Sequence, residues 1–463
     1  MIIQKGDLEH FLHVIKTTLP PHINAIIEKY HEEGRNIYKG NVLTHPSIPT
    51  CQNFELLQKT FEYIAYITCN LLYNKKLYLH CHLENKIVYS SYSGLINIEE
   101  ENAPKTLFTY YLFDGKHPFI LVYGGCLYIP FFIYYLLDDI YIDLVNAPIN
   151  KPGDEIYVKV LKLVLEDLKN RKVQSNKVVM SFANHYQAGH YLWSEISGLD
   201  ILIRTNLIKN IDILLLHEFD LCSAYKVIQE YNKNCKIISY KELETVKSGI
   251  YGFIASGFIL DKTKDLYLKN TISIEPSRKL VIMIIIKADR RYLHNIEDVY
   301  TSLLNKLVEN KVLVAQDTTI LFEGLYRNES NEFLKNFYTR FGEKYNNIVQ
   351  TIIDKIDTSF DCISLIGRHF DEIIKYYKCV NYWIGQAGSN IELIMQINKN
   401  GLMITTTEFD YGIEQQCFYV ENRINQNMIY AKNMQSSNRF EDSIKVDENE
   451  LYDKFEKMLL SGN

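Results

Sequence analysis

Three basic side chains follow the apolar run KLVIMIIIKA (279–288) and precede a helix signal at Asn295. They are Lys287, Arg290 and Arg291. Backbone N–H groups at a helix N-terminus favour an anion, and guanidinium groups can hold phosphate oxygens in pairs. We therefore expect this loop to bind a phosphate-bearing ligand. The alternative is that the two arginines are only solvated on a surface loop.

A second junction between a strand and a helix lies in YWIGQAGSNIELI (382–394). Gly388 permits a tight turn, Ser389 is the expected N-cap, and Glu392 follows three residues later as in a capping box. Such a turn presents amide groups to a ligand, so we expect contacts from Gly388, Ser389, Asn390 and Glu392. Any turn of this kind also benefits from glycine and a cap. A glycine-rich dinucleotide fingerprint and a P-loop are both missing from the sequence.

The segment NHYQAGHYLWSEISG (184–198) offers candidates for acid–base chemistry. Steps of 100° along a helix place Leu192, Ile196, Leu199 and Ile203 on one side, and His190, Ser194 and Ser197 on the opposite side. An imidazole in the first turn can act as a general base or bind a sugar hydroxyl or a phosphate. We expect His190 to be the base, with Glu195 as the second candidate. The alternative is that His190 is half-buried and hydrogen-bonded at a domain interface.

Metal-binding patterns are weak in this sequence. His80 and His82 share one face of an expected strand, but no further ligands are spaced to complete a zinc site. The segment LLDDIYID has three carboxylates that could hold a divalent cation, those of Asp138, Asp139 and Asp143. The motifs D-x-D, GxSxG and HExxH do not occur, which disfavours serine hydrolases and zinc proteases. We expect no metal site.

Two parallel sheets must position these residues. From about residue 155 the chain alternates between helices and apolar strands, as in βαβ units. The pattern restarts with KLVIMIIIKA and continues through the expected strands KVLVAQ, DCISLIG, VNYWIGQAG and GLMITTT. We therefore expect an α/β fold with two Rossmann-like domains that face a cleft, where the carboxyl ends of strands usually bind ligands.

The same patterns give the expected domain boundaries. Residues 1–154 form an α+β accessory region, 155–275 the first Rossmann-like domain, and 276–445 the second. Residues 446–463 form an amphipathic helix, with Leu451, Phe455 and Leu459 on one face. We expect this helix to pack back across the first domain.

Composition limits the class of function. The formal net charge is -6 and no block of Lys and Arg occurs, so we expect no nucleic-acid partner. Nine cysteines without a CxxC pair indicate a reducing compartment, and the N-terminus lacks the apolar core of a secretory signal. The 20 uncharged residues 118–137 contain a Gly-Gly pair, Pro130 and four tyrosines, which favour buried strands over a membrane span. Peripheral membrane contact stays open.

Three segments resemble motifs of a known family. In AGHYLWSEISGL, KADRRYLHNIEDV and YWIGQAGSNIELI, on a chain with two expected Rossmann-like domains, the sequence resembles GT-B glycosyltransferases. The family 61-like enzymes and related bacterial surface-polysaccharide transferases are the most similar in pattern. There a histidine followed by an aromatic and an acidic residue opens a helix of the first domain, an R-x-x-x-N-like loop begins the second, and a G-[SA]-x-x-x-N/E-like turn lies by the donor. The resemblance covers residues 170–410, and QAGSN replaces the usual HGSG-type turn.

The resemblance implies roles for the candidate residues. His190 is then the polar or basic group on the acceptor side; Lys287, Arg290 and Arg291 neutralise the donor diphosphate; and Ser389, Asn390 and Glu392 line the nucleotide or sugar. Enzymes of this fold need no D-x-D metal site, because basic side chains and a helix N-terminus offset the charge of the leaving diphosphate.

The resemblance leads us to expect a cytoplasmic, metal-independent glycosyltransferase. Its co-substrate is a nucleotide sugar, its acceptor is a hydroxyl of a glycan, a lipid-linked molecule or a protein, and it has no further cofactor. One alternative is a nucleotide-sugar epimerase-like α/β enzyme, which needs no acceptor. Another is a non-catalytic protein that binds a sugar nucleotide or a partner.

Overall fold

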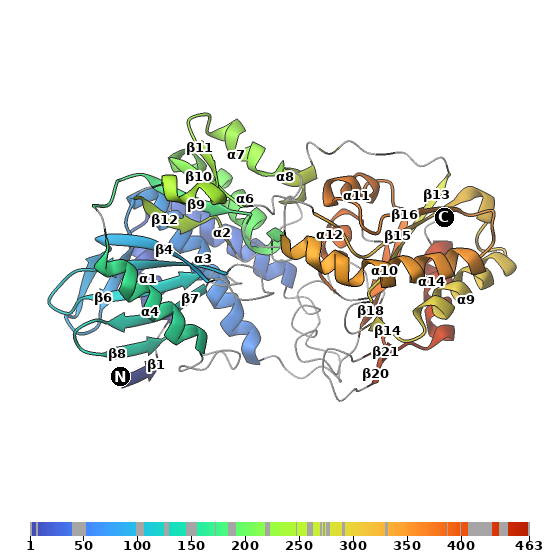
Figure 1. Cartoon of the computed structure of the whole chain (residues 1–463), viewed down its shortest axis with the longest axis horizontal. Helices are drawn as coiled ribbons and strands as arrows, with labels where there is room; N and C mark the ends of the chain where they lie inside the picture. Colours follow the sequence, from blue (N-terminus) through green and yellow to red (C-terminus); the bar gives the residue numbers. More distant parts are fainter. Residues whose placement is uncertain are drawn as a thin grey trace. The chain divides into compact units, whose positions relative to one another are not determined.

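The computed structural model of the chain has two compact units, formed by residues 1–35 with 52–267 and by residues 36–51 with 268–463 (Figure 1). Each unit contains a parallel sheet with helices, which confirms the expected α/β class with two Rossmann-like domains. The structure describes residues 2–461 except 6–7, 39–51, 99–105, 125–128, 145–154, 172, 184–190, 218–222, 247, 257–262, 269–270, 272–273, 275–277, 289–291, 329–331, 387, 399, 406–427 and 435–442.

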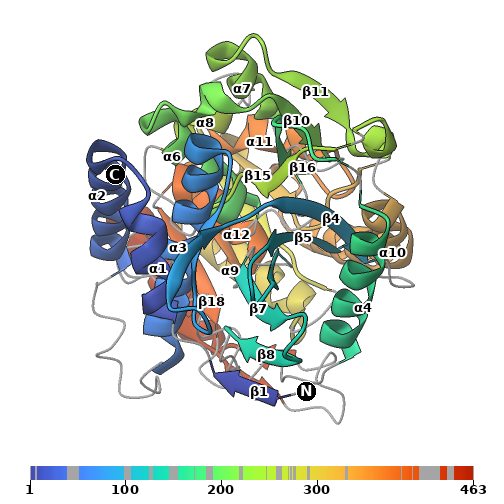
Figure 2. The ribbon, with the colours of Figure 1, turned by 90° about the vertical axis from the view of Figure 1, so that its left-hand side faces the viewer.

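The first unit, coloured blue to green in Figure 1, begins with β1 (Ile2–Lys5), α1 (Leu8–Thr17), α2 (Pro21–Tyr38) and α3 (Gln52–Asn74). A hairpin of β2 (Tyr78–Cys81) and β3 (Lys86–Tyr89) follows. The next five strands form an antiparallel meander: β4 (Tyr92–Ile98), β5 (Thr106–Phe113), β6 (Phe119–Gly124), β7 (Ile129–Tyr135) and β8 (Ile140–Asp143). Strand β1 pairs in parallel with β8, so the sheet has the order β1-β8-β7-β6-β5-β4 (Figure 2).

Strands β6 and β7 account for most of the uncharged segment 118–137. They pair with each other in antiparallel fashion, and every residue of β6 is buried. Strands buried in a sheet read as continuous apolar runs, so the expectation of buried strands is confirmed. Among the described residues, the structure contains no helix with the length and apolar character needed to cross a membrane.

The parallel sheet of the first unit has four strands. They are β9 (Val178–Phe182), β10 (Ile213–Leu216), β11 (Lys236–Ser239) and β12 (Ile250–Phe253), in the order β11-β10-β9-β12. The helical segments of this region are α4 (Glu155–Lys169), the π-helix Tyr191–Ile196, α6 (Ser197–Arg204), the 3-10 turns Leu207–Asn210 and Tyr240–Thr245, α7 (Tyr225–Tyr231) and α8 (Lys264–Leu268). The order in which the chain adds strands to this sheet reverses direction between β9 and β12.

Side chains of the N-terminal region bond the outer edge of β12. The Ser93 Oγ accepts a hydrogen bond from the Tyr251 N–H at 3.0 Å, and the Tyr111 hydroxyl donates to the Tyr251 carbonyl at 2.8 Å. The Thr68 hydroxyl donates to the Phe253 carbonyl at 3.0 Å. These bonds join residues from both sides of the expected boundary at 154/155, so this boundary lies inside one compact unit.

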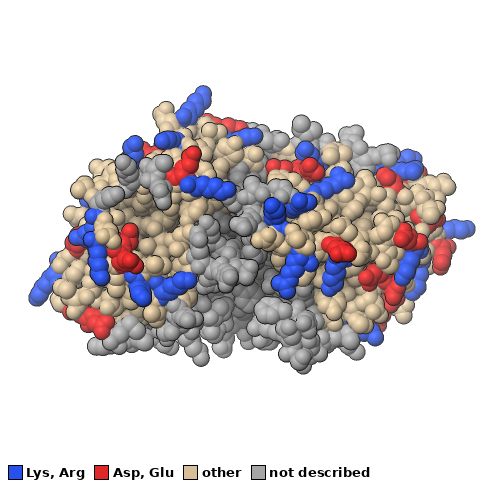
Figure 3. Space-filling model, viewed as in Figure 1, with Lys and Arg blue, Asp and Glu red and all other residues tan. Residues whose placement is uncertain are grey.

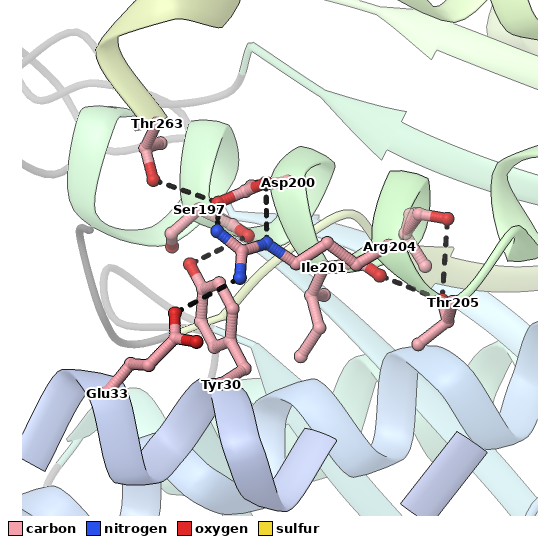
Figure 4. A network of polar contacts seen from close by, with 9 residues as sticks. Tyr30, Glu33, Ser197, Asp200, Ile201, Arg204, Thr205 and Thr263 are labelled. Carbon is pink, nitrogen blue, oxygen red and sulfur yellow. Dashed lines mark hydrogen bonds and ion pairs between the residues drawn. The ribbon is translucent and has the colours of Figure 1, made fainter. Parts of the chain in front are cut away.

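A polar network joins α2 to α6 (Figure 4). The Arg204 guanidinium contacts both carboxylate oxygens of Asp200, at 3.1 and 3.3 Å, and donates to Glu33 of α2 at 3.2 Å. The Thr263 hydroxyl also donates to Asp200. Partial burial disfavours the charged guanidinium, but the hydrogen bond and attraction of Asp200 outweigh it and raise the pKa of Arg204. The network thus fixes α6 to α2.

The second unit, coloured yellow to red in Figure 1, has a sheet of six parallel strands. They are β13 (Leu280–Ile285), β15 (Thr318–Glu323), β16 (Asp361–Ser364), β17 (Tyr382–Gln386), β18 (Gly401–Thr405) and β19 (Met428–Tyr430), in the order β16-β15-β13-β17-β18-β19. Numbered along the chain, this is 3-2-1-4-5-6, the order of the doubly wound nucleotide-binding fold.

The remaining elements of this unit cover or extend the sheet. The helices are α9 (Ile296–Glu309), α10 (Glu332–Lys355), α11 (Phe370–Tyr377), α12 (Ser389–Ile397) and α14 (Glu448–Ser461). A small sheet is made of β14 (Tyr292–Leu293), β20 (Lys432–Met434) and β21 (Ser443–Lys445). On the face drawn in Figure 3, basic and acidic side chains lie among one another in each unit.

The expected strand KVLVAQ is wrong. Lys311 has a φ of 60°, and the N–H groups of Val312 and Leu313 both donate to the Leu307 carbonyl, so these residues terminate α9. A 3-10 turn follows at Ala315–Asp317. The second strand of this sheet is instead β15, in which all six residues are buried. A short apolar run after a helix can close the helix instead of forming a strand, and here it does.

The C-terminal helix α14 packs on its own unit. Its buried residues Leu451, Phe455, Met458 and Leu459 belong to the core that also contains the apolar face of α9. On α9 the predicted residues Ile296, Val299, Leu303 and Leu307 are all buried. The apolar face of α14 is therefore buried within the second unit. The expectation that this helix packs across the first domain is corrected.

Candidate functional site

The order of the second sheet reverses between β13 and β17, which are neighbours. The connections from two adjacent parallel strands leave in opposite directions at such a point, and their carboxyl ends leave a crevice that usually binds the ligand. Lys287 follows β13 by two residues, and Gly388 follows β17 by two residues. The structure thus brings together the two loops that the sequence singled out.

The Lys287 ammonium group lies against the N-terminus of α12. A Cβ atom built on Gly388 would be only 3.1 Å from the Lys287 Nζ, so the ammonium group occupies the space that a side chain would fill. Gly388 is the N-cap residue, in an extended conformation, and provides no side chain to cap the helix. The expectation that Ser389 is the N-cap is therefore corrected, since α12 begins with Ser389 as its first helical residue. The Lys287 ammonium group thus lies beside the N-terminal N–H groups of α12.

Neighbouring elements hold the loop after β13 in place. The Lys344 ammonium group of α10 donates to the Ala288 carbonyl at 2.7 Å and lies 4.6 Å from the centre of the Tyr292 ring. The loop then forms β14, and the His294 N–H donates to the Ile444 carbonyl. Asn295 occupies the expected N-cap of α9, in a left-handed conformation and without a side-chain cap bond.

Five further residues are predicted to line this site. Arg290 and Arg291 lie outside the described residues. For Ser389, Asn390 and Glu392 the structure describes the backbone alone, which forms the first turn of α12. Their predicted contacts with a ligand stay predictions.

Buried polar side chains end three strands of this sheet. Glu323 is the last residue of β15, Gln386 of β17 and Thr405 of β18, and each is at most 3% exposed. The Thr405 hydroxyl has no hydrogen-bond partner among the described residues. Sequence reasoning missed Glu323 and Thr405. The available signal was a polar residue that closes an otherwise apolar strand, at the edge where ligands bind.

The site expected in the first unit is described in part. His190 lies in the segment 184–190, outside the described residues. Glu195 is fully buried, and its carboxylate accepts a hydrogen bond from the Ala183 N–H at the end of β9. Ala183 has a φ of 63°, a strained value for a residue with a side chain. The Glu195 carboxylate thus helps to fix the turn after β9, and its role as a base stays a prediction.

The polar face predicted around His190 is buried where it is described. Ser194 and Ser197 are both at most 1% exposed. The Ser256 N–H donates to the Ser194 carbonyl, and the Tyr30 hydroxyl donates to the Ser197 carbonyl. The expectation that Ser194 and Ser197 lie opposite the buried side of the helix is therefore corrected, because both are buried. Residues 191–196 form a π-helix, so steps of 100° do not apply, and protein packs on both sides of the helix.

An unpredicted pair of polar side chains lies at the carboxyl ends of β9 and β10. The Ser181 Oγ and the His217 Nε2 are 2.8 Å apart, and the His217 ring stacks on the Tyr240 ring with centres 4.2 Å apart. Ser181 is 2% exposed, too buried to attack a substrate, so this pair orients the imidazole. The available signal was a histidine directly after the apolar run ILLL (213–216).

Other candidate groups take part in local contacts. The His80 and His82 rings lie 5.4 Å apart, Asp138 contacts the His117 ring, and Asp139 accepts from Tyr134. Among the described residues no group of three or more His, Cys, Asp or Glu could hold a metal ion. Burial raises the pKa of Cys69 to about 12 and that of Cys235 to about 11, so neither is a thiolate nucleophile at neutral pH.

Comparison with known proteins gives structural likeness only. No family model matches the chain. No curated protein matches it either. Among solved structures it is similar to the ADP-heptose lipopolysaccharide heptosyltransferase II of E. coli, at 8% identity and a TM-score of 0.30, over 62% of this chain and 99% of that one.

It is also similar to two trehalose-phosphate synthases. For the UDP-forming enzyme of Burkholderia xenovorans the identity is 8% and the TM-score 0.26, over 66% of this chain and 74% of that one. For the enzyme of Burkholderia multivorans the values are 8% and 0.26, over 70% and 82%. These neighbours are GT-B glycosyltransferases. At such identities and TM-scores the likeness assigns no activity and no site residue to this chain.

Proposed function

We propose that the protein is a glycosyltransferase whose second unit binds the diphosphate of a nucleotide-sugar donor between β13 and β17. The observation that carries this proposal is the Lys287 ammonium group against the N-terminus of α12, at the point where the strand order reverses. A fixed cation and the positive end of a helix dipole both stabilise phosphate. A dinucleotide-binding site of this fold would need its glycine-rich turn after β13, where this chain has the sequence KADRRYLHN.

The reaction follows from the charge at this point. An acceptor oxygen attacks the anomeric carbon of the donor, and the bond from that carbon to the diphosphate oxygen breaks, leaving its electron pair on the diphosphate. Lys287, with Arg290 and Arg291, stabilises the negative charge that develops there, without a metal ion. His190 takes the proton of the acceptor hydroxyl. Glu195 is the second candidate and would first have to leave the Ala183 N–H.

Finer features of the proposal rest on the sequence. Ser389, Asn390 and Glu392 line the nucleotide or the sugar, and the acceptor hydroxyl belongs to a glycan, a lipid-linked molecule or a protein. The first parallel sheet is assigned to the acceptor side and the second to the donor side. We place the reaction in the cytoplasm, with peripheral membrane contact where the acceptor is lipid-linked.

Donor binding is tested by calorimetric titration with UDP, GDP, ADP and CDP. We expect at least one nucleotide to bind, and Lys287→Ala to weaken it by about 10- to 100-fold, the range for a lost charge-assisted hydrogen bond. Lys335→Ala is the matched control, because Lys335 is an exposed lysine on α10 of the same unit. The proposal fails if no nucleotide binds, or if the two variants bind equally well.

Turnover separates this proposal from its alternatives. We expect release of nucleoside diphosphate from the matching nucleotide sugar only when an acceptor is present, and loss of this release in His190→Ala with donor binding retained. An epimerase would convert the sugar on the intact donor without an acceptor, which proton NMR of the sugar detects. A binding protein would hold the donor unchanged in both experiments.

A further inference from the structure

A tight turn after β16 holds an arginine at the carboxyl edge of the second sheet. Gly367 has a φ of 76°, and its N–H donates to the Leu325 carbonyl at 2.7 Å. The Tyr338 ring packs so closely on Gly367 that a Cβ atom there would overlap it. The Arg368 N–H then donates to the Leu365 carbonyl. The turn needs glycine for both reasons, and it fixes the backbone of Arg368.

The Arg368 side chain is held as well. Its Nε donates to the carbonyl of Ser364, the last residue of β16, at 3.1 Å, and its Nη1 donates to the Tyr376 hydroxyl at 3.3 Å. The guanidinium carbon lies 5.8 Å from the centre of the Tyr376 ring. The first of these bonds places the guanidinium directly at the end of β16, at the same edge as Lys287.

Two of the guanidinium's donors are used in this way, and it has five N–H groups in all. The others have no partner among the described residues, and no described carboxylate lies within ion-pair distance of Arg368. Asp371, the acidic residue three positions on, faces His369 instead, at 3.7 Å. Arg368 is therefore a half-buried, positioned cation, and three of its N–H groups have no partner in the described part of the chain.

The spacing between the strands that precede Arg368 and Lys287 suits one ligand. Strand β16 is two strands away from β13 in the order β16-β15-β13, and neighbouring strands are about 4.8 Å apart. The carboxyl ends of β16 and β13 are thus about 10 Å apart along the sheet edge. A nucleoside diphosphate with its phosphates at Lys287 can extend along this edge and bring its base to the end of β16.

We propose that Arg368 selects the nucleobase of the donor, favouring uracil and guanine over cytosine and adenine. This inference rests on the proposed function, because it takes the diphosphate to lie at Lys287. A guanidinium group only donates hydrogen bonds. Uracil and guanine present a carbonyl oxygen, O4 or O6, where cytosine and adenine carry an amino group. A carbonyl accepts from the guanidinium, whereas an amino group would set donor against donor, as in the reading of guanine by arginine.

The test compares the affinities of UDP, GDP, CDP and ADP, measured by calorimetry. For the natural chain we expect UDP or GDP to bind about 5- to 150-fold more tightly than its amino counterpart, the range for one good base contact. Arg368→Ala should lose most of this preference while CDP and ADP keep their weak affinity. Tyr376→Phe, which removes the phenol that positions Nη1, should lose part of it.

The matched control is Arg340→Ala. Arg340 is an arginine of the same unit that lies over the Phe341 ring, on α10. Its removal should leave the base preference unchanged. A thermal melt of Arg368→Ala identifies any loss of folding, and Tyr376→Phe keeps the proposal testable if Arg368→Ala is unfolded.

The outcomes separate this inference from the proposed function. If Lys287→Ala weakens all four nucleotides and Arg368→Ala weakens none of them, or all of them equally, the inference is overturned and the proposed function stands. A natural chain that prefers CDP or ADP also overturns the inference alone. If no nucleotide binds the natural chain, both fail.

Discussion

At the residue scale, Gly388 shapes the proposed donor site most directly. Its missing side chain leaves room for the Lys287 ammonium group, and it leaves the first turn of α12 without a side-chain cap. A serine at an N-cap is somewhat more favourable than a glycine, because its hydroxyl accepts from a helix N–H. The same hydroxyl would occupy the N–H groups that a phosphate needs.

Gly388→Ser should therefore change stability and affinity in opposite directions. We expect the free energy of unfolding to rise by a few tenths of a kcal/mol and nucleotide affinity to fall by several-fold. Gly388→Asp should abolish binding, because its carboxylate would pair with Lys287 and repel a phosphate. Urea denaturation and calorimetric titration measure the two effects. Unchanged affinity in both variants would show that the phosphate does not lie at this helix.

At the scale of elements, the network around Arg204 ties α6 to α2, as Figure 4 shows. The Asp200 side chain is 10% exposed, so loss of its guanidinium partner leaves a buried carboxylate poorly compensated. Arg204→Met should lower the free energy of unfolding by roughly 1–3 kcal/mol. Asp200→Asn in the same chain should recover part of this loss, since the two side chains are coupled.

The control for this prediction is an exposed pair. The Lys355 Nζ lies 3.0 Å from the Asp298 carboxylate, but the two side chains are 49% and 69% exposed. Lys355→Met should cost less than about 1 kcal/mol, as for most surface ion pairs. Equal effects in chemical denaturation of Arg204→Met and Lys355→Met would mean that the Arg204 network adds nothing beyond a surface contact.

Helices and strands with a clear periodic pattern could be predicted from the sequence. The buried face of α9 and the strands β13, β17 and β18 follow directly from their residues. The predicted strand KVLVAQ was wrong because a run of four apolar residues can form the end of a helix as well as a strand. The π-helix 191–196 was not predicted, because a pattern of apolar residues does not indicate where a helical turn is widened.

The candidate site could be predicted in part. The loops of Lys287 and Gly388 were found because both follow apolar strands. Their adjacency depends on the strand order, which the sequence does not state. Glu323 ends a strand, His217 directly follows one, and Arg368 lies four residues beyond one. The sequence did not single them out, because only the fold shows which strand ends share one edge.

At the scale of the whole molecule, each unit has a core of its own. The second unit buries the apolar faces of α9, α10 and α14 in one cluster. We expect differential scanning calorimetry to show two unfolding transitions. The nucleotide that binds should raise the midpoint temperature of only one of them. At a concentration about 100 times the Kd the increase in stability should be about 2.7 kcal/mol.

Phe455→Ala identifies which transition belongs to the second unit. Phe455 is fully buried in this core, so its loss should cost about 3–5 kcal/mol and lower the transition that the nucleotide raises. If the nucleotide raises one transition and Phe455→Ala lowers the other, donor binding in the second unit is wrong. A single transition that responds to both changes would show that the units unfold together.

The bonds on β12 have a consequence for association between copies of the chain. An open edge strand offers a row of N–H and C=O groups to any other strand, which is the usual route to edge-to-edge aggregation. Here Ser93, Tyr111 and Thr68 occupy those groups on residues 251 and 253 without themselves forming a fifth strand. Side chains of the meander and of α3 thus end the parallel sheet at β12, and they cover the edge on which a further strand could add.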